Sequence, residues 1–453
     1  TQGDRQRLAA YVAAHRRFSI VAGGPGTGKT TTVARLLAVL QDLEDGRLRV
    51  ALAAPTGKAA ARLTEATADA VSGFKADDRS RLGTLTASTL HRLLGSRRGE
   101  RTRFWHDRDN RLPYDVVVVD EASMVSLTLM SRLVEALRPQ CRLILVGDPH
   151  QLSSIEVGAV LGDLVHRPAP DGVTPLPADS QRAERDLDAL TAEERNAART
   201  TGLVSLTEPH RFFGKIADLA EAIRRGDANS VDALLDGGHP DIDYVEADEA
   251  TEPDVAGLKR DVLEAGRALI DAARAGQASD ALAALGKHRV LCAHREGPWG
   301  VAQWSRQVQD WLSDAIDGYG TDGLWYLGSP LLVTSNDYQL KLFNGDTGVI
   351  VSSDGQPRAA FLREGRVDLL APSRLGDVQT VHAMSIHRSQ GSQFERVTIV
   401  LPPVDSPLLT RELLYTAVTR AERRVRIIGA REAVLAAVAR PITRASGLRS
   451  IRG

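Results

Sequence analysis

The chain has 453 residues, of which 43% are hydrophobic and 25% are charged, and its formal net charge is −1 at pH 7. This length is enough for about three domains, and the balanced charge neither requires nor excludes a polyanionic partner, because a nucleic-acid groove needs only local positive potential. No run reaches the roughly 18 apolar residues of a membrane helix, and we expect no signal peptide.

The first predicted strand, Phe18 to Ala22, leads into a phosphate loop. The four fixed positions of the pattern G-x-x-x-x-G-K-[ST] are filled by Gly23, Gly28, Lys29 and Thr30. A helix that begins at about Lys29 directs its free N–H groups at a phosphate. In this pattern the lysine reaches the β- and γ-phosphates and the threonine hydroxyl is a ligand of Mg²⁺, and a glycine-rich turn without a ligand is the disfavoured alternative. We expect the nucleotide to contact Gly23, Gly24, Pro25, Gly26, Thr27, Gly28, Lys29, Thr30 and Thr31.

Three further apolar runs, at residues 49–54, 116–120 and 142–146, alternate with helical patterns, as in a parallel βαβ sheet. The middle run ends in Asp120 and Glu121, at the carboxyl end of a strand, where ligands gather in open α/β sheets. Asp120 is expected to hold Mg²⁺, and Glu121 to orient or deprotonate a water molecule. Adjacent carboxylates alone often form a solvated turn, but after a phosphate loop they favour hydrolysis of a nucleoside triphosphate.

The remainder of the chain divides into an irregular middle and a second sheet. Residues 95–113 look like a small hairpin excursion, and residues 165–200 look like a mobile insertion. Strand patterns resume at residues 289–297, 381–402 and 423–430. Between them, shorter strand patterns with an Asn-Gly-Asp turn indicate a small β-barrel inserted in a second α/β domain.

The order of the remaining motifs resembles that of superfamily 1 helicases. Gln6 lies seventeen residues before Gly23, where a side-chain amide can pair with adenine. The motifs that follow are APTGKAAARL at 54–63, TASTLHRLLG at 86–95, LVGDPHQLSSIEVGAVLGDL at 145–164, EPHRF with Arg211, HAMSIHRSQGSQF at 382–394 and LLYTAVTRAERRV with Arg420. From Gln6 to about Gly429 the chain resembles the RecD family, the α subunit of the bacterial exonuclease V (RecBCD) complex.

The resemblance implies an α/β fold of two RecA-like parallel-sheet domains of the P-loop NTPase type. The first domain is expected at residues 1–205, with the hairpin at 95–113, and the second at 206–435. A small SH3-like β-barrel is expected as an insert in the second domain at about 328–375, and a C-terminal tail at 436–453. ATP and Mg²⁺ are expected to bind between the two domains.

The resemblance also assigns roles to single residues. The expected catalytic set is Lys29, Asp120, Glu121, Gln151, Arg211 and Arg420, with Gln6 reading adenine and with Thr30 and Asp120 as metal ligands. Gln151 senses the γ-phosphate, and the two arginines stabilise charge on the leaving phosphoryl group. DNA contacts are expected at Thr56, Gly57, Ser88, Thr89, His91, His387, Ser389 and Gln390. Phe343 is either a base-stacking platform or part of the barrel core, and Arg388 stands where relatives commonly have lysine.

The implied function is that of an ATP-dependent 5′ to 3′ DNA helicase, the motor subunit of RecBCD in double-strand break repair and homologous recombination. Its expected partners are DNA and RecB-like and RecC-like subunits. Ser153 and Ser154 favour the complex-borne subunit, because free-standing relatives usually have a proline there. A free-standing helicase, a nucleotide-dependent scaffold and a metabolic kinase are the alternatives, and neither of the last two would respond to single-stranded DNA.

Three further expectations concern surroundings and partners. Cys141 and Cys292 lie in apolar runs, which favours buried thiols over a disulfide or metal site and suits a reducing cytoplasm. Family members normally carry a domain before the glutamine that docks on the partner subunit, so we expect this module to be either trimmed or missing. No further cluster of carboxylates with a lysine is visible, so nuclease activity is expected in another subunit.

The excursion at 95–113 has two interpretations. In this family it emerges beside the DNA channel, where a short rigid element can split base pairs, and Phe104 and Trp105 would then stack on the last pair while Arg97, Arg98, Arg101 and Arg103 hold the displaced strand. Alternatively, it is a solvated loop with both aromatic side chains packed against the domain.

Overall fold

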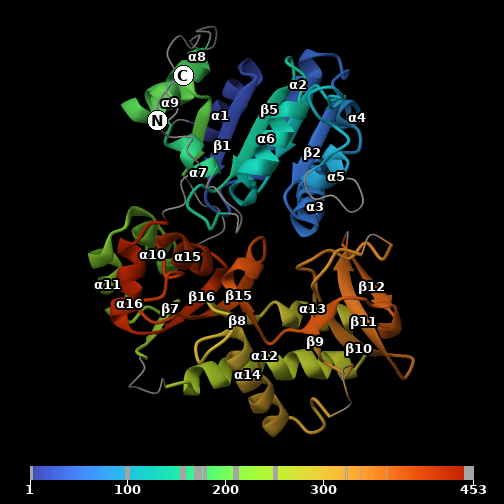
Figure 1. Cartoon of the computed structure of the whole chain (residues 1–453), viewed down its shortest axis with the longest axis vertical. Helices are drawn as coiled ribbons and strands as arrows, with labels where there is room; N and C mark the ends of the chain where they lie inside the picture. The colour runs from blue at the N-terminus through green and yellow to red at the C-terminus, as the bar shows by residue number, and fades with distance from the viewer. Residues whose placement is uncertain are drawn as a thin grey trace. The chain divides into compact units, whose positions relative to one another are not determined.

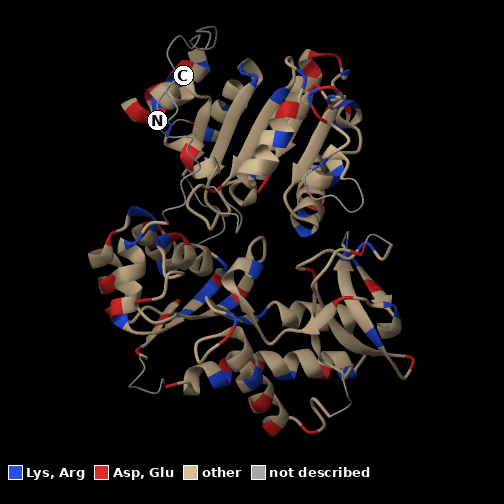
Figure 2. Ribbon diagram, viewed as in Figure 1, with Lys and Arg blue, Asp and Glu red and all other residues tan. Residues whose placement is uncertain are grey.

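The computed structural model describes residues 4–96, 103–153, 160–167, 176, 181–207, 214–247, 254–321, 323, 325–337, 339–363 and 365–442. These residues form two compact units, one made of residues up to 207 and the other of residues 214–442 (Figure 1). Basic and acidic residues are interspersed over the elements of both units (Figure 2), in line with the balanced charge. Among the described residues, no helix combines the length and the apolar character needed to cross a membrane.

The first unit is built on a six-stranded parallel sheet with the strand order β3-β2-β4-β5-β1-β6. Its strands are β1 Phe18–Gly23, β2 Val50–Ala54, β3 Ala87–Thr89, β4 Val116–Val119, β5 Arg142–Gly147 and β6 Leu203–Leu206. The four valines of β4 are fully buried because helices cover both faces of the sheet. Alternate valines of the strand therefore belong to two different cores, Val116 and Val118 to one and Val117 and Val119 to the other.

Ten helical segments surround this sheet. They are α1 Arg5–His15, α2 Lys29–Leu43, α3 Gly57–Ser72, α4 Ala76–Leu82, α5 Leu90–Leu94, η1 Ala122–Met124, α6 Leu127–Ala136, α7 Val160–Val165, α8 Gln181–Asp188 and α9 Ala192–Thr200 in the described part of the chain. Helices α1, α2 and α3 pack on one face of the sheet, and α5, α6 and α7 pack on the other.

The described residues of the region expected as a mobile insertion are largely helical. Within residues 165–200, α8 and α9 contribute Leu187 and Ala198 to the core beneath α1. Thr191 and Glu194 form a capping box at the start of α9. The expectation for residues 181–200 was therefore wrong, because tertiary packing orders two helices that show little apolar periodicity.

The second unit holds a five-stranded parallel sheet with the order β14-β8-β15-β16-β7. Its strands are β7 Ile242–Val245, β8 His288–Cys292, β14 Ala383–Ser385, β15 Phe394–Val400 and β16 Ala421–Ile428. Its helical segments are α10 Lys215–Arg225, α11 Ala228–Asp236, α12 Ala256–Arg274, α13 Ala278–Leu285, α14 Val301–Ala315, η3 Ile386–Ser389, α15 Arg411–Val418 and α16 Arg431–Ala439. Helix α16 lies beyond the expected domain end at residue 435 for its last four residues.

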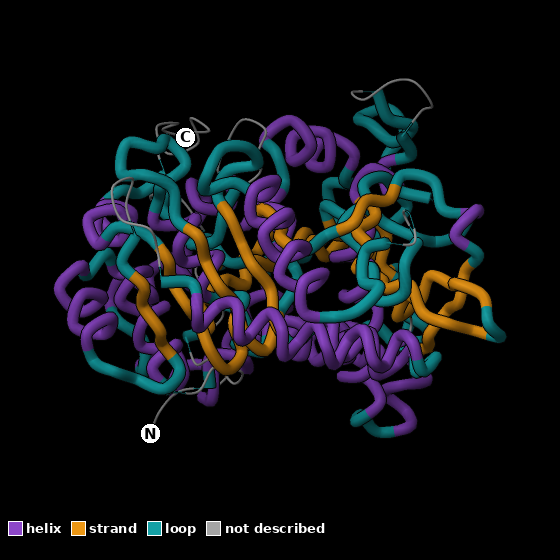
Figure 3. Tube along the Cα trace, turned by 90° about the horizontal axis from the view of Figure 1, so that it is seen from below, coloured by secondary structure: helices purple, strands orange, loops and turns teal. Residues whose placement is uncertain are grey.

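An antiparallel sheet is inserted between α14 and β14. Its order is β12-β11-β10-β9-β13, with β9 Pro330–Val333, β10 Thr347–Ser353, β11 Gln356–Arg363, β12 Arg366–Leu370 and β13 Val378–Thr380, and a short helix η2 Pro372–Arg374 precedes β13. Val349 and Val351 on β10 pack against Leu269 and Ala273 of α12. Figure 3, in which helices are purple and strands are orange, shows the helices beside the strands of the sheets. The expected fold class, two parallel sheets with an insert in the second, is confirmed.

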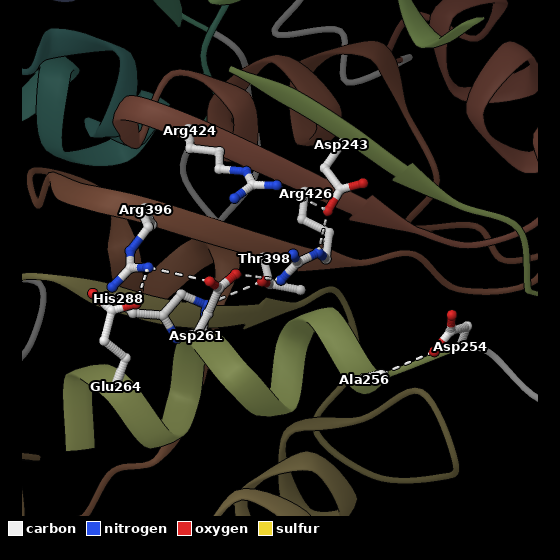
Figure 4. Close-up of polar contacts among 10 residues, drawn as sticks. All are labelled: Asp243, Asp254, Ala256, Asp261, Glu264, His288, Arg396, Thr398, Arg424 and Arg426. Atoms are coloured by element: carbon white, nitrogen blue, oxygen red, sulfur yellow. Dashed lines mark hydrogen bonds and ion pairs between the residues drawn. The ribbon is translucent and has the colours of Figure 1, made fainter. Parts of the chain in front are cut away.

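A buried network of ion pairs fastens α12 to the second sheet (Figure 4). The Arg426 guanidinium on β16 donates from Nη1 to Asp261 Oδ2 on α12 at 2.5 Å and from Nε to Asp243 Oδ2 on β7 at 2.7 Å. Arg396 on β15 donates from its Nη1 to Asp261 Oδ1 at 3.1 Å and to Glu264 Oε2 at 3.0 Å. The Arg426 and Asp261 side chains are only 3% and 7% exposed, so their charges depend on each other rather than on water.

The network also includes a neutral histidine. His288 on β8 lies 3.0 Å from Thr398 Oγ1 through its Nε2. Burial, with the charges of Arg396, Arg289 and Arg426, lowers the pKa of His288 to about 3. Its ring is therefore uncharged at neutral pH and adds no further positive charge to the arginines around it.

Candidate nucleotide and nucleic-acid sites

The phosphate loop joins β1 to α2 in the first unit. Gly28, the residue before α2, has a φ of 82°, a conformation that glycine adopts without strain. The Lys29 Nζ donates to the carbonyl oxygens of Gly23 and Gly24, each at 2.8 Å. The Thr27 hydroxyl also donates to the Gly24 oxygen, at 2.9 Å. The lysine ammonium is therefore held inside the loop, where a phosphate-binding cation is required.

Gln6, on α1, lies against this loop. Its Nε2 donates to the Thr27 carbonyl at 3.3 Å, and its Oε1 accepts from Arg35 Nη1 at 3.4 Å. A Cβ placed on Gly28 would lie 2.3 Å from Gln6 Nε2, so the side chain passes directly over the backbone at this position. The amide has one further N–H and one further lone pair, which are the groups that pairing with adenine requires.

The acidic pair follows β4 at the carboxyl edge of the sheet. Asp120 Oδ1 accepts from the Glu121 N–H at 2.9 Å, and Glu121 has a φ of 50°, in the left-handed region that non-glycine residues seldom adopt. Burial and the charge of Glu121 raise the pKa of Asp120 to about 6, and the charge of Lys29 partly offsets this shift. Lys29 and Asp120 therefore lie close enough to interact, as a shared phosphate and metal site requires.

Gln151 lies after β5 at the same edge. Its side chain is buried, and its Nε2 donates to Asp148 Oδ2 at 3.1 Å. Asp148 is itself 1% exposed and accepts the His150 N–H through its other oxygen, at 3.0 Å. Asp148 thus fixes the orientation of the Gln151 amide. Sequence analysis assigned no role to Asp148. Its position three residues before Gln151, just after a strand, could have indicated that it orients the glutamine.

The arginines expected to act on the γ-phosphate belong to the second half of the chain. Arg211 lies outside the described residues. Arg420 is 3% exposed, and its guanidinium donates to the Thr416 oxygen at 3.0 Å, to the Ser392 oxygen at 3.1 Å and to Thr419 Oγ1 at 3.2 Å. Arg420 therefore connects α15 to the loop that carries Ser392, and its guanidinium is held by protein groups.

The DNA residues expected in the first unit gather at one place. β2 and β3 pair with Ala54 opposite Thr89, which brings the ends of both strands together. Thr56 caps α3 through a bond from the Ala59 N–H, and Thr89 caps α5 through a bond from the Arg92 N–H, each at 3.2 Å. These hydroxyls are thus engaged in helix caps. Gly57 is buried, Ser88 is half-buried and His91 is exposed beside them.

The residues expected to contact DNA in the second unit differ in exposure. Ser389 is fully buried, and its hydroxyl donates to the Ile386 oxygen at 2.8 Å inside η3. His387 and Gln390, on either side, are half-buried. Phe343 is half-buried as well and begins the Asn-Gly-Asp turn, with its N–H donating to Asp346 Oδ2 at 2.8 Å. Its ring is not among the described side chains that make up the core of the insert.

The excursion at 95–113 separates its two aromatic side chains. Phe104 is 8% exposed and belongs to the core beneath α5 and α6, whereas Trp105 is 60% exposed. Residues 97–102, with Arg97, Arg98 and Arg101, lie outside the described residues. Phe104 is therefore unavailable for stacking on a base pair, and of these two aromatic side chains Trp105 alone is exposed.

The two cysteines are free and buried, as expected. Burial raises the pKa of the Cys141 thiol to about 11, and burial also raises that of Cys292. No group of three or more metal-binding side chains occurs in the part of the chain that the structure describes.

Two family models match the chain, an AAA domain over residues 6–157 and a UvrD-like helicase C-terminal domain over residues 380–428. The first covers the phosphate loop and the acidic pair, so nucleotide use follows from it. A solved structure of Pif1 helicase from Candida albicans aligns with 96% of each chain at a TM-score of 0.46 and 14% identity, which is too distant to support a conclusion.

Curated relatives are much closer. The RecBCD enzyme subunit RecD of Mycobacterium tuberculosis is 51% identical over 451 residues, which cover 98% of this chain and 72% of that protein. The subunit of the same name from Haemophilus influenzae is 34% identical, with the same coverage. The ATP-dependent RecD2 DNA helicase of Deinococcus radiodurans is 31% identical over 96% of this chain and 50% of that protein. The chain therefore belongs to the RecD family.

Proposed function

We propose that this protein is an ATP-driven DNA helicase that moves 5′ to 3′ along one strand, as the RecD motor subunit of a RecBCD-type complex. The observation that carries the proposal is that the Lys29 ammonium interacts with Asp120, the residue before Glu121, at the carboxyl edge of the first sheet. A phosphate-binding cation and a carboxylate pair at one edge are the parts that in-line hydrolysis of a nucleoside triphosphate needs.

ATP and Mg²⁺ are the proposed cofactors. Thr30 and Asp120 would hold the metal ion, which supplies charge compensation for the phosphates when it is bound. Glu121 would orient the attacking water, and Gln151, positioned by Asp148, would respond to the γ-phosphate. Arg211 and Arg420 are proposed to stabilise the developing charge, and Arg420 must exchange part of its present hydrogen bonds to do so.

DNA and RecB-like and RecC-like subunits are the proposed partners, in double-strand break repair and homologous recombination, with the cytoplasm as the proposed location. The strand would contact Thr56, Gly57, Ser88, Thr89 and His91 in the first domain, proposed at 1–205. In the second domain, proposed at 206–435, it would contact His387, Ser389, Gln390 and Phe343. For the buried Ser389 and the helix-capping threonines, backbone groups are the available donors. The alternative is a free-standing helicase, to which the lower identity of 31% gives less support.

The test compares Lys29→Ala with Lys75→Ala, an exposed lysine of the same unit, as the matched control. ATP turnover is measured with and without oligothymidylate. Stimulation of the parent and of the control by the oligonucleotide, with no turnover by Lys29→Ala, supports the proposal. Turnover that is indifferent to single-stranded DNA points instead to a scaffold or a kinase.

Two further measurements address polarity and assembly. Partial duplexes with either a 5′ or a 3′ overhang test the direction, and preferential unwinding of the 3′-tailed substrate contradicts it. Purification from cell extract tests assembly, because a stable and fully active monomer supports the free-standing alternative over the subunit.

A further inference from the structure

Arg295 and Arg388 lie at equivalent positions in the segments that follow two neighbouring strands of the second sheet. β8 and β14 pair in parallel with Cys292 opposite Ser385, and each arginine follows its strand's paired residue by three positions. The carboxyl ends of adjacent parallel strands meet at one edge of a sheet, which is where open α/β folds bind ligands. Arg295 belongs to none of the helicase motifs.

Both arginines are carried by short, tightly closed segments. The Arg388 N–H donates to Ser385 Oγ at 3.4 Å, in the cap of η3. The Arg295 carbonyl oxygen accepts the Ala302 N–H at 3.0 Å, and the Gly300 N–H donates to the Gly297 oxygen at 3.0 Å. A Cβ on Gly300 would lie 2.4 Å from the Glu296 oxygen. This close packing limits the movement of the backbone beneath the two side chains.

Neither arginine of this pair has an ion-pair partner among the described residues. In the described part of the chain, no carboxylate oxygen lies within 4.0 Å of either guanidinium. By contrast, Arg396, Arg426 and Arg431 of the same unit each contact two carboxylates. Burial lowers the pKa of Arg388, and the charge of Arg295 lowers it further. Two like charges held at one edge are stabilised when an anion binds between them.

We propose that Arg295 and Arg388 together bind phosphodiester groups of a single DNA strand. Guanidinium groups match phosphate oxygens in a bidentate arrangement, and a DNA backbone offers successive phosphates to two neighbouring side chains. The carboxyl edge that carries this pair also carries His387 and Gln390, which are expected to contact DNA. The inference rests on the proposed helicase function and adds a residue and a binding mode to it.

The experiment measures the salt dependence of binding of a fluorescent oligothymidylate to the full chain, with whichever subunits co-purify. The variants are Arg295→Ala, Arg388→Gln and the double variant, and Arg388→Lys keeps the charge. Arg267→Ala is the matched control, because Arg267 is an exposed arginine on α12 of the same unit and lies in none of the helicase motifs. ATP turnover without DNA is measured for each variant, with thermal melting as the test of folding.

Each phosphate contact to a single strand contributes about 0.7 to the slope of log affinity against log salt. The slope should therefore become shallower by about 0.7 in each single variant and by about 1.4 in the double variant. At 0.1 M salt relative to 1 M salt, one contact corresponds to about fivefold in affinity. Arg388→Lys and Arg267→Ala should keep the parent slope, and Arg267→Ala should also keep the parent turnover without DNA.

Three outcomes would overturn the proposal. Parent-like slopes in folded Arg295→Ala and Arg388→Gln variants would show that neither side chain contacts DNA. A raised KM for ATP without DNA would show that the pair binds nucleotide phosphates instead. If the parent chain neither bound the oligonucleotide nor responded to it in ATP turnover, the proposed helicase function itself would fail.

Discussion

Replacement of Asp261 tests the fastening of α12 to the second sheet. Its carboxylate is 7% exposed and accepts from Arg426, which is 3% exposed, and from Arg396, which is 15% exposed. Removing one partner of a buried ion pair destabilises a protein by about 3–5 kcal/mol, because it leaves a buried charge without compensation. Arg426 retains Asp243 and Arg396 retains Glu264, so we expect the lower end, about 3 kcal/mol, for Asp261→Ala.

Glu264→Ala is the matched control, since it removes a carboxylate from the same helix and the same arginine. The Glu264 side chain is 65% exposed, and Arg396 keeps Asp261, so the loss should stay below about 1 kcal/mol. Urea unfolding is followed by tryptophan fluorescence. Four of the five tryptophans lie in the second unit, and two of them, Trp304 and Trp311, share a core with Leu258 of α12. Equal losses for the two variants would refute the reasoning.

The remaining predictions concern the first unit. The proposed role of Asp120 as a Mg²⁺ ligand requires its ionised form, and its pKa is raised to about 6. Affinity for Mg·ATP, measured by calorimetric titration, should therefore fall as the pH drops through 6, approaching about tenfold per unit; affinity that is constant from pH 7.5 to 5 contradicts this. The same raised pKa means that the ionised carboxylate opposes folding above pH 6, so Asp120→Asn should raise the melting temperature at pH 7.5, and a lower melting temperature would be inconsistent with it. Phe104→Ala should destabilise by about 3–5 kcal/mol, and Trp105→Ala by no more than about 0.5 kcal/mol; if Trp105 is a wedge, its replacement slows duplex unwinding but not ATP turnover on single strands. Gly28→Ala introduces a Cβ 2.3 Å from Gln6 Nε2 at a φ of 82°. If Gln6 reads the base, this change should raise the KM for ATP more than the KM for GTP. An equal rise in both would show that Gln6 does not recognise the base.

The sequence was sufficient to predict the phosphate loop and four strands of the first sheet, β1, β2, β4 and β5, because these depend on local patterns, whereas β3 and β6 were not predicted. The four valines of β4 are apolar in succession since both faces are covered, and the loop needs fixed residues at fixed spacing. The inserted antiparallel sheet was likewise predictable from short strands around an Asn-Gly-Asp turn.

Helices α8 and α9 were not predictable in the same way. Their apolar residues are few, and long-range polar contacts hold them in place: Arg5 Nη1 donates to Glu194 Oε1 at 2.8 Å, and Arg7 Nη2 to Asp186 Oδ1 at 2.7 Å. The partners in each pair lie about 180 positions apart, at separations of 189 and 179 residues. The periodicity of a short segment cannot indicate contacts between residues so far apart in the sequence.

In the candidate site, too, the sequence identified the motif residues but not the side-chain contacts that they make. Motif spacing identified Gln151 but not Asp148, which orients it, and Ser389 but not the use of its hydroxyl inside η3. Phe104 and Trp105 are adjacent in the sequence, and nothing in the sequence indicated that one of them is buried and the other exposed. The difference arises because only Phe104 reaches the apolar space beneath α5 and α6, which tertiary packing creates.

Helix α12 has a mechanical consequence for the second unit. Its 19 residues extend for about 28 Å, with Asp261 near one end anchored to the parallel sheet and Leu269 and Ala273 near the other packed against β10 of the insert. Gly266, between these sites, lies so close to α14 that a Cβ there would meet Leu312 at 2.3 Å. Such a helix is a rigid connection without a hinge, so a displacement of the parallel sheet is expected to move the inserted sheet with it.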